Sequence, residues 1–115
     1  MSGFLKEVDL KSDMPTSDTA IKRVTYNIRN GKTLGAAAVK FIHGYGSTGK
    51  GGKIRVETRR YLADQKLKRH IRDFIPGEEF SIFEEATRAA FALCDELRRD
   101  RDLDRHNNGV TFVIL

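Results

Sequence analysis

The sequence has one cysteine, Cys94, so no internal disulfide bond can form within its 115 residues. A lack of disulfides is typical of reducing compartments, and we expect a cytoplasmic protein with a structural thiol at Cys94. No stretch approaches the roughly 20 apolar residues that cross a bilayer, so no membrane partner is expected. The N-terminal MSGFLKEVDLK also lacks the basic start and apolar run of a secretory signal. Without repeats or linkers, residues 1–115 are expected to form a single domain.

Recognisable metal and nucleotide sites are missing as well. His70 and His106 stand at no spacing typical of metal ligands, so the sequence identifies no metal site. The stretch GYGSTGKG approaches the nucleotide-binding pattern G-x-x-x-x-G-K-[ST], but Gly51 stands where a magnesium-binding hydroxyl belongs. The short remaining chain has no apolar strand that ends in a carboxylate and supplies a second magnesium ligand. We therefore expect no nucleotide.

The positive charge is concentrated in one block. Residues 50–72 carry nine Lys or Arg and two Asp or Glu, so this block has a net charge of +7. That is more than the net charge of +5 of the whole chain. Residues 73–115 are acidic, with ten Asp or Glu against five Lys or Arg. A basic block directly after a glycine-rich loop favours a polyanionic partner. A solvated helix face with a lysine-rich turn is the alternative interpretation.

Apolar periodicity predicts alternating strands and helices in the first half of the chain. Lys6–Leu10 has the alternation of a short strand, and Ala37–Ile42 has the apolar run of a central strand. Between them, a helix is expected to end near Asn30, where Gly31 is a natural stop. A second helix follows the glycine loop and continues to about Gln65.

The second half contains two further strands and a helix. His70–Ile75 alternates as a third strand, and the β-branched stretch Gly109–Leu115 is the last one. Between them, Ser81 and Glu84 fit a capping box at the start of a helix of about residues 80–100. The charged stretch RRDRDLDRHNNG that follows is expected to be a loop.

The element order βαβαβαβ predicts an α/β fold with a four-stranded, partly parallel sheet. Right-handed crossovers place the first two helices on one face of this sheet. The glycine loop then lies beyond the carboxyl end of the second strand, where open sheets bind ligands.

The stretch HGYGSTGKGG has five glycines within residues 44–52 and joins a strand to a helix. Glycine permits close backbone approach, and a helix start offers unpaired N–H donors and partial positive charge. The loop is therefore predicted to hold phosphate. Beyond Tyr45 and Tyr61 no aromatic residues are interleaved with the basic ones, so we expect recognition of backbone and shape. The predicted electrostatic footprint consists of Lys50, Lys53, Arg55, Arg59, Arg60, Lys66 and Lys68.

The stretch FIHGYGSTGKGGKIRVETRRYL resembles the central motif of the Smr (small MutS-related) domain family. In that family an apolar strand ends in His-Gly-x-Gly, and a turn rich in Gly, Thr and Lys leads into a helix that begins Leu-Arg. NGVTFVIL is similar to the family's closing Gly-Val-Thr strand, and VDLKS resembles its Leu-Asp-Leu-His-Gly segment. The residues that match the central motif are His43, Gly44, Gly46, Ile54 and Arg55.

The resemblance implies a fold and a function. The family fold is a two-layer α/β sandwich with a mixed sheet, similar to the C-terminal domain of a bacterial translation initiation factor. Family members bind DNA or RNA, and several nick nucleic acid as endonucleases. The resemblance thus implies nucleic-acid binding through the His43-Gly-x-Gly loop and the basic second helix, with nicking as a further activity. The family joins its last two strands by a short connection, where this chain inserts the helix of about residues 80–100.

Two residues are candidates for phosphodiester hydrolysis, which needs an activated nucleophile and positive charge. His43 can serve as a base, an acid or a phosphate donor, or it anchors the loop through a hydrogen bond. Asp9 can bind a metal or orient His43, or it caps the following turn. Lys11 replaces the histidine of the family's first motif and stays protonated near neutral pH, so it contacts phosphate instead. A divalent metal is expected as cofactor only for a nuclease.

An alternative function is a protein-interaction or assembly module. The inserted helix would then expose Phe80 and Phe91 for self-association, or it would instead cover the bare face of the sheet. For the leading hypothesis, the predicted nucleic-acid-binding residues are Lys11, Gly44, Tyr45, Gly46, Lys50, Lys53, Arg55, Arg59 and Arg60.

Overall fold

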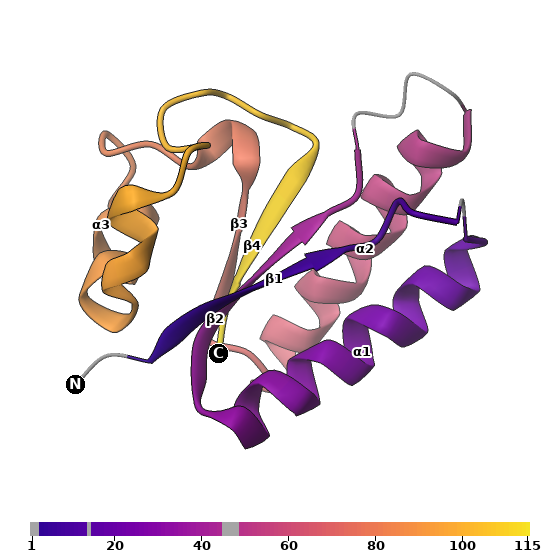
Figure 1. Cartoon of the computed structure of the whole chain (residues 1–115), viewed down its shortest axis with the longest axis horizontal. Helices are drawn as coiled ribbons and strands as arrows, with labels where there is room; N and C mark the ends of the chain where they lie inside the picture. The colour runs from indigo at the N-terminus through magenta and orange to yellow at the C-terminus, as the bar shows by residue number, and fades with distance from the viewer. Residues whose placement is uncertain (1–2, 14, 45–48) are drawn as a thin grey trace.

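The computed structural model describes residues 3–13, 15–44 and 49–115, and of residues 49–51 it describes the backbone alone. A four-stranded sheet with the order β1-β2-β4-β3 lies at its centre (Figure 1). Strands β1 and β2 run parallel, whereas β4 is antiparallel to both of its neighbours, so the predicted mixed sheet is confirmed. The strands are β1 (Phe4–Asp9), β2 (Ala36–Ile42), β3 (Asp73–Pro76) and β4 (Val110–Ile114).

Two long helices form the second layer of the predicted sandwich. Helices α1 (Ser17–Leu34) and α2 (Gly49–Leu67) lie side by side on one face of the sheet, as the crossover rule predicts (Figure 1). The opposite face is covered by α3 (Glu85–Leu93) and by the 3-10 turns Gly77–Glu79 and Asp95–Arg99. We call the chain between β3 and β4, which contains these elements, the inserted segment. It covers the face of the sheet that α1 and α2 leave bare.

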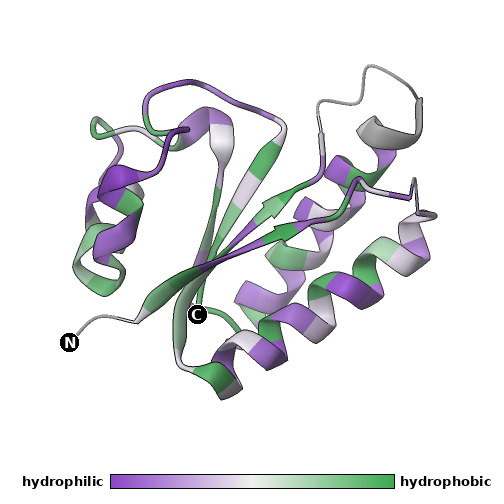
Figure 2. Cartoon of the chain, viewed as in Figure 1, coloured by the Kyte–Doolittle hydropathy of each residue, from purple (hydrophilic) through white to green (hydrophobic). Residues whose placement is uncertain are grey.

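The central strands are apolar because both of their faces are covered. Side chains alternate along β2, so Val39 and Phe41 pack under α1 and α2, whereas Ala38 packs on the α3 side. In β4, Val113 packs on the side of α1 and α2, and Phe112 packs on the α3 side. Figure 2 shows hydrophobic residues concentrated in the sheet, while α1 and α2 mix hydrophobic and hydrophilic residues along their length.

Helix α1 is longer than predicted. It begins after the N-cap Thr16, whose side chain accepts a hydrogen bond from the N–H of Thr19 at 3.3 Å. Its last residue is Leu34, and the C-cap Gly35 adopts φ +84°. The N–H of Gly35 donates to backbone oxygens of the last helical turn. The predicted stop at Gly31 is wrong, because this buried glycine lies inside the helix against β2. A Cβ there would come within 3.3 Å of Val39, so Gly31 allows close packing rather than termination.

Helix α2 begins at Gly49, inside the glycine-rich stretch, and continues beyond the predicted end. Its positions Ile54, Thr58 and Leu62 are buried against the core, as their helical spacing predicts. Strand β3 starts later than predicted, at Asp73, because the chain still turns at Arg69 with φ +61°.

The predicted helix of about residues 80–100 is divided in two. Helix α3 ends at Leu93, and Cys94 is extended, with φ −146° and ψ 96°, before the second 3-10 turn begins. This break allows both Cys94 and Leu97 to reach the core, where neither is exposed. Burial raises the pKa of the Cys94 thiol, which keeps it protonated.

The predicted capping box is wrong. Glu84 lies before the first turn of α3, and its N–H donates to the backbone oxygen of Ser81 at 3.0 Å. The hydroxyl of Ser81 instead accepts from the N–H of Phe83 at 3.2 Å. A tight turn therefore stands where the sequence pattern predicted the first helical turn, and the Phe83 side chain is exposed.

Of the two alternatives for Phe80 and Phe91, exposure on the surface is wrong and packing on the sheet is what the structure shows. Phe80 is 1% exposed and stacks on Phe112 of β4, with ring centroids 4.0 Å apart. Phe91 is half-buried and meets Phe80 edge-on at 6.4 Å. Both aromatic rings hold the inserted segment on the sheet.

Lys40 carries a buried charge in the middle of β2. Its side chain is 1% exposed, and its Nζ lies 2.9 Å from Asp100 and 2.6 Å from Asp102. A third carboxylate, Glu7 of β1, lies 3.8 Å away. Burial alone would raise the pKa of Asp102, but the hydrogen bonds from Lys40 and Asn107 outweigh it and lower that pKa. The predicted loop after residue 99 is thereby fixed to the sheet.

Candidate nucleic-acid interface

The two motifs of the predicted site meet at one end of the sheet. The backbone N–H groups of His43 and Gly44 both donate to the carbonyl of Gly109, each at 3.0 Å. Gly44 adopts φ +84°, a conformation that favours glycine. A Cβ on Gly109 would lie 3.3 Å from the carbonyl carbon of Gly44, so this close approach also favours glycine. The His-Gly turn is thus built directly on the start of β4.

The His43 side chain lies inside this junction and is not exposed. Its Nδ1 lies 3.0 Å from the carbonyl oxygen of Gly44, and its Nε2 lies 2.8 Å from the hydroxyl of Thr111. A carbonyl oxygen only accepts, so Nδ1 carries the proton and Nε2 accepts from Thr111. The Nε of Arg59 in turn donates to the Thr111 hydroxyl at 3.1 Å. In this series of hydrogen bonds, from Arg59 through Thr111 to His43 and Gly44, every donor has an acceptor when the imidazole is neutral.

Burial, together with the cationic side chains of Arg59 and Arg55, lowers the pKa of His43 to about 4 despite the opposing hydrogen bond to Gly44. The imidazole is therefore neutral at neutral pH. Because both ring nitrogens are engaged and the ring is enclosed, His43 anchors the loop in this conformation. Its predicted role as a catalytic base or acid stays a prediction.

Arg59 is committed to an internal ion pair. Its two terminal nitrogens bind the two carboxylate oxygens of Glu78 at 2.8 and 2.7 Å, in a bidentate pair. Burial alone would raise the pKa of Glu78, but the hydrogen bond from Arg59 and its positive charge lower it. Arg59 was predicted to bind nucleic acid, yet its guanidinium joins α2 to the inserted segment and to the His43 junction.

Asp9 ends β1 and caps the turn that follows. Its Oδ1 accepts from the N–H of Lys11 at 2.8 Å and of Ser12 at 3.0 Å, and its Oδ2 accepts from the Ser12 hydroxyl at 2.7 Å. Slight burial would raise the pKa of Asp9, but these hydrogen bonds outweigh it and lower that pKa. Asp9 is thus ionised and exposed. Its carboxylate accepts from Lys11 and Ser12, while both ring nitrogens of His43 have other partners, Gly44 and Thr111.

A hollow of about 180 Å³ lies beside the His-Gly turn, and we call it the loop hollow. Lys11 lines it from the end of β1, and Arg101 lines it from the inserted segment, together with Gly44 and Gly109. Asp102 also lines it, and its carboxylate is paired with Lys40 at 2.6 Å. Arg101 is exposed and lies 3.6 Å from Glu7. Two cations from distant parts of the chain therefore flank the predicted phosphate-binding turn.

The remaining predicted residues are divided. Lys53 is exposed on α2, and Arg55 is half-buried on the same helix. Arg60 lies 3.1 Å from Glu57, one helical turn away. The predicted positions that lie outside the described residues or side chains are Tyr45, Gly46 and Lys50.

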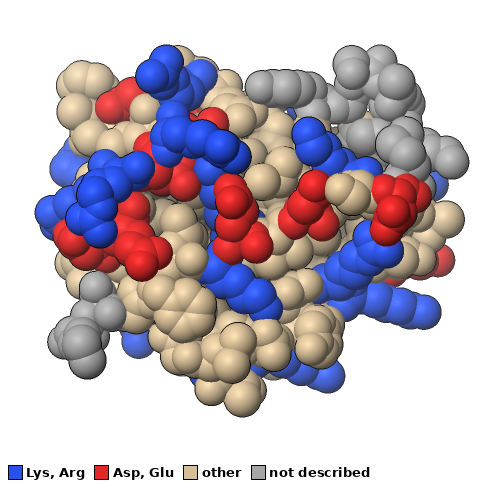
Figure 3. All heavy atoms as spheres, in the orientation of Figure 1, with Lys and Arg blue, Asp and Glu red and all other residues tan. Residues whose placement is uncertain are grey.

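Ion pairs change the interpretation of the basic block. Besides Arg59 and Arg60, two members of the predicted footprint are paired: Lys66 with Asp73 at 2.9 Å, and Lys68 with Asp64 at 3.0 Å. The face of the molecule in Figure 3 interleaves basic and acidic side chains, without one continuous basic surface. The charge count of the sequence therefore overstates the cations that α2 presents to a ligand.

Sequence reasoning missed four residues of this site: Thr111, Glu78, Asn107 and Arg101. Thr111 had a signal in the sequence, because it is the threonine of the Gly-Val-Thr stretch. The register of β4 on β2 then determines where Thr111 lies in the sheet. Asn107 orders Gly109 by accepting its N–H at 2.9 Å, and its own amide donates to Asp102 at 2.8 Å. Glu78 and Arg101 had no local signal, since each acts on a distant segment.

Within residues 3–13, 15–44 and 49–115, no group of three or more His, Cys, Asp or Glu side chains is placed to hold a metal ion.

No helix among the described residues has both the length and the hydropathy needed to cross a membrane.

Comparisons with known proteins identify the fold. No protein-family model matches the sequence, and no curated protein matches it. Among solved structures, the chain is similar to the Smr domain of Thermus thermophilus MutS2, with a TM-score of 0.58 and 22% sequence identity. The match covers 96% of this chain and 96% of that chain. The fold that the His-Gly and Gly-Val-Thr stretches predicted is confirmed: this chain has an Smr-like fold.

Proposed function

We propose that this chain binds the phosphate backbone of DNA or RNA at the end of the sheet that holds the loop hollow. The observation that carries the proposal is that Lys11 and Arg101, from distant parts of the chain, both line the hollow beside the Gly44–Gly109 junction. Phosphate contacts in nucleic-acid complexes come mostly from Lys, Arg and free backbone N–H groups. The Smr-like fold supports the same conclusion, because nucleic-acid binding is the function that the family resemblance implies.

The buried network explains how such a site is held in shape. Arg59, Thr111 and His43 form a chain of hydrogen bonds that ends at the carbonyl of Gly44. Because His43 stays neutral, it adds no charge and fixes the conformation of the turn. We assign binding to the exposed cations and positioning to His43 and Arg59.

The test is a double substitution, Lys11→Gln with Arg101→Gln. In a fluorescence titration with a DNA duplex and an RNA stem-loop, the log-log salt slope is expected to fall by about 1.8, since each phosphate contact contributes about 0.9 in a duplex. The affinity at low salt is expected to fall roughly ten-fold or more.

A matched control keeps the same change in net charge. The variant Lys22→Gln with Arg88→Gln removes two exposed cations, one on α1 and one on α3, and is expected to bind like the unchanged protein. Equal affinities and salt slopes for the two double variants would contradict a phosphate site at the loop hollow.

Nicking is a second candidate function, favoured by the exposed, ionised carboxylate of Asp9 next to Lys11. We expect any nicking of supercoiled plasmid or structured RNA in the presence of Mg²⁺ or Mn²⁺ to be abolished by Asp9→Asn, because Asp9 would be the anionic ligand of a metal that such a reaction uses. His43→Ala tests the predicted base in the same assay. Activity that persists in both variants would assign the nicking to a contaminant or to other residues.

A further inference from the structure

The loop hollow continues into a second hollow on the inserted segment. This second hollow has a volume of about 420 Å³. The two hollows share three lining residues, Arg101, Asp102 and Asn107, and the second is also lined by Arg105 and His106. Because of the shared residues, the two hollows adjoin on the same side of the molecule. We call the second one the segment hollow.

The joined surface presents positive charge to solvent. Arg105 is exposed, and the Arg101 side chain is 77% exposed although Glu7 lies 3.6 Å away. Lys11, which lines the loop hollow, is exposed as well. Among the described residues, the joined surface therefore has three exposed Lys or Arg side chains, one after β1 and two on the inserted segment.

The acidic residues of this stretch have partners within the protein. Asp102 lines both hollows, but it is buried, with the Nζ of Lys40 at 2.6 Å and the amide of Asn107 at 2.8 Å. Asp104 is exposed, and its carboxylate accepts from the N–H of Ile82 at 3.2 Å. The joined surface is therefore expected to raise the local concentration of anions.

The backbone that carries Arg105 is fixed on both sides. Before Arg105, the N–H of Asp104 donates to the carbonyl of Phe80 at 3.0 Å. After it, the Nδ1 of His106 lies 3.3 Å from the carbonyl oxygen of Glu78. Asp104 and His106 adopt positive φ, of 62° and 54°, so the chain turns sharply at each of them. Arg105 is thus held beside the loop hollow before a ligand arrives, and little backbone ordering would accompany binding.

We propose that the nucleic acid bound at the loop hollow extends across the segment hollow, where Arg105 contacts its phosphate backbone. This inference rests on the proposed function and adds the inserted segment to its footprint. Arg101 lies where the two hollows join and serves both. A guanidinium group can donate two parallel hydrogen bonds to one phosphate. Because the contact is to the backbone, it is expected with every base sequence.

The experiment measures the salt dependence of binding to the same DNA duplex and RNA stem-loop in single-residue variants. Arg105→Gln is expected to lower the log-log slope for the duplex by about 0.9, the contribution of one phosphate contact. The affinity at low salt is expected to fall roughly three-fold. Arg105→Lys keeps the charge at this position and is expected to keep the slope.

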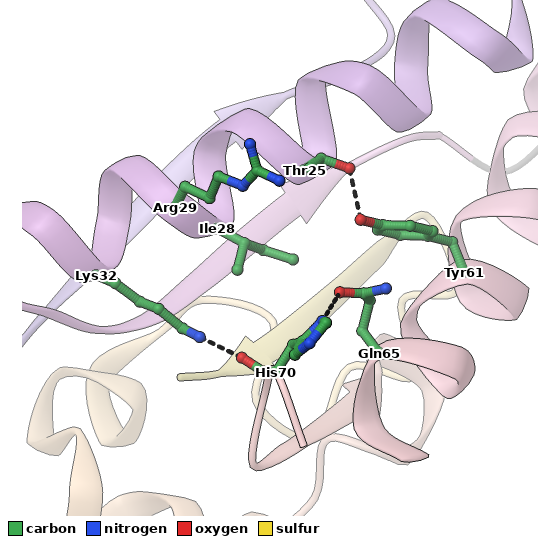
Figure 4. A pocket seen from close by; sticks show the side chains of 7 residues that line it. All are labelled: Thr25, Ile28, Arg29, Lys32, Tyr61, Gln65 and His70. Atoms are coloured by element: carbon green, nitrogen blue, oxygen red, sulfur yellow. Dashed lines mark hydrogen bonds between the residues drawn. The ribbon is translucent and has the colours of Figure 1, made fainter. Parts of the chain in front are cut away.

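Two controls remove one exposed cation elsewhere. Arg29→Gln alters a separate hollow of about 370 Å³ between α1 and α2, on the other face of the sheet (Figure 4). Arg88→Gln alters α3, which covers the same face as the rest of the inserted segment. Both variants are expected to leave the slope unchanged. Circular dichroism with thermal unfolding checks that every variant is folded.

The outcomes distinguish the two proposals. If the unchanged protein binds no duplex or stem-loop, the proposed function and this inference are both overturned. If binding depends on Lys11 and Arg101 but Arg105→Gln keeps the original slope, this inference alone is overturned. A loss of slope in Arg105→Lys equal to that in Arg105→Gln would also overturn it, because the charge would then not be the cause. An equal loss in Arg29→Gln or Arg88→Gln would do the same, because the effect would then come from net charge.

Discussion

Replacing Lys40 with methionine is expected to lower the free energy of unfolding by about 3–5 kcal/mol, the typical cost of leaving a buried charge uncompensated. The ammonium group is 1% exposed and neutralises Asp100 and Asp102, whose side chains are only 8% and 12% exposed. Without Lys40, these carboxylates would remain at the buried interface between the sheet and the inserted segment. Urea unfolding followed by circular dichroism measures the change.

A triple variant isolates the cause of this loss. Lys40→Met combined with Asp100→Asn and Asp102→Asn removes all three charges together and is expected to be more stable than Lys40→Met alone. The exposed Lys22→Met is the matched single control and is expected to change stability by less than about 0.5 kcal/mol. A Lys40→Met protein as stable as this control would contradict a structural role for the buried ion cluster.

Stability is expected to fall steeply between neutral pH and pH 4 because of His43. Its pKa is lowered by burial from 6.5 to about 4 in the folded protein. Above pH 7 the ring is neutral in both states, so His43 contributes no pH dependence there. As the pH falls below 6.5, the unfolded chain takes up a proton that the folded protein does not, so folding loses about 1.4 kcal/mol per pH unit. The total loss from this residue approaches about 3 kcal/mol near pH 4.

The variant His43→Gln tests this assignment through the slope of the free energy of unfolding against pH. This slope is informative whatever the variant's stability at a single pH. Glutamine has no proton to gain, so the pH dependence between 4.5 and 6.5 is expected to flatten in urea-unfolding series. His70→Gln serves as control, because His70 is exposed and is expected to leave the slope unchanged. The lowered pKa values of Asp9 and Asp102 cost stability below their ordinary value of 3.8, and that of Glu78 does so from its ordinary value of 4.5 downward, so Glu78 adds to the slope only at the lower end of this range. An unchanged slope in His43→Gln would contradict the buried neutral histidine.

The inserted segment also supports the candidate site. Lys40 holds Asp102, Asp102 accepts from Asn107, and Asn107 accepts the N–H of Gly109. Gly109 in turn accepts from the turn at His43 and Gly44. The inserted segment therefore does more than cover the sheet, because it positions the residues that surround the loop hollow.

The sequence predicted the elements whose signals are local. The apolar runs of β2 and β4, the buried stripe Ile54, Thr58 and Leu62 of α2, and the mixed sheet all follow from periodicity and element order. Errors arose where tertiary packing outweighed a local signal. Gly31 packs closely on β2 instead of ending α1, and Cys94 interrupts the third helix so that it can enter the core together with Leu97.

The sequence by itself determined the layered α/β fold and the location of a glycine-rich stretch at the end of a buried strand, because backbone propensity and hydrophobic spacing are properties of neighbouring residues. The Smr-like fold followed from the resemblance of its motifs to that family. Only the tertiary structure decided which charges are available to a ligand. Arg59 belongs to the basic block by sequence, yet Glu78 neutralises it, whereas Arg101 from the acidic half stands beside the turn. Ion pairs join residues that the chain brings together over long separations, so a charge count along the sequence cannot identify them.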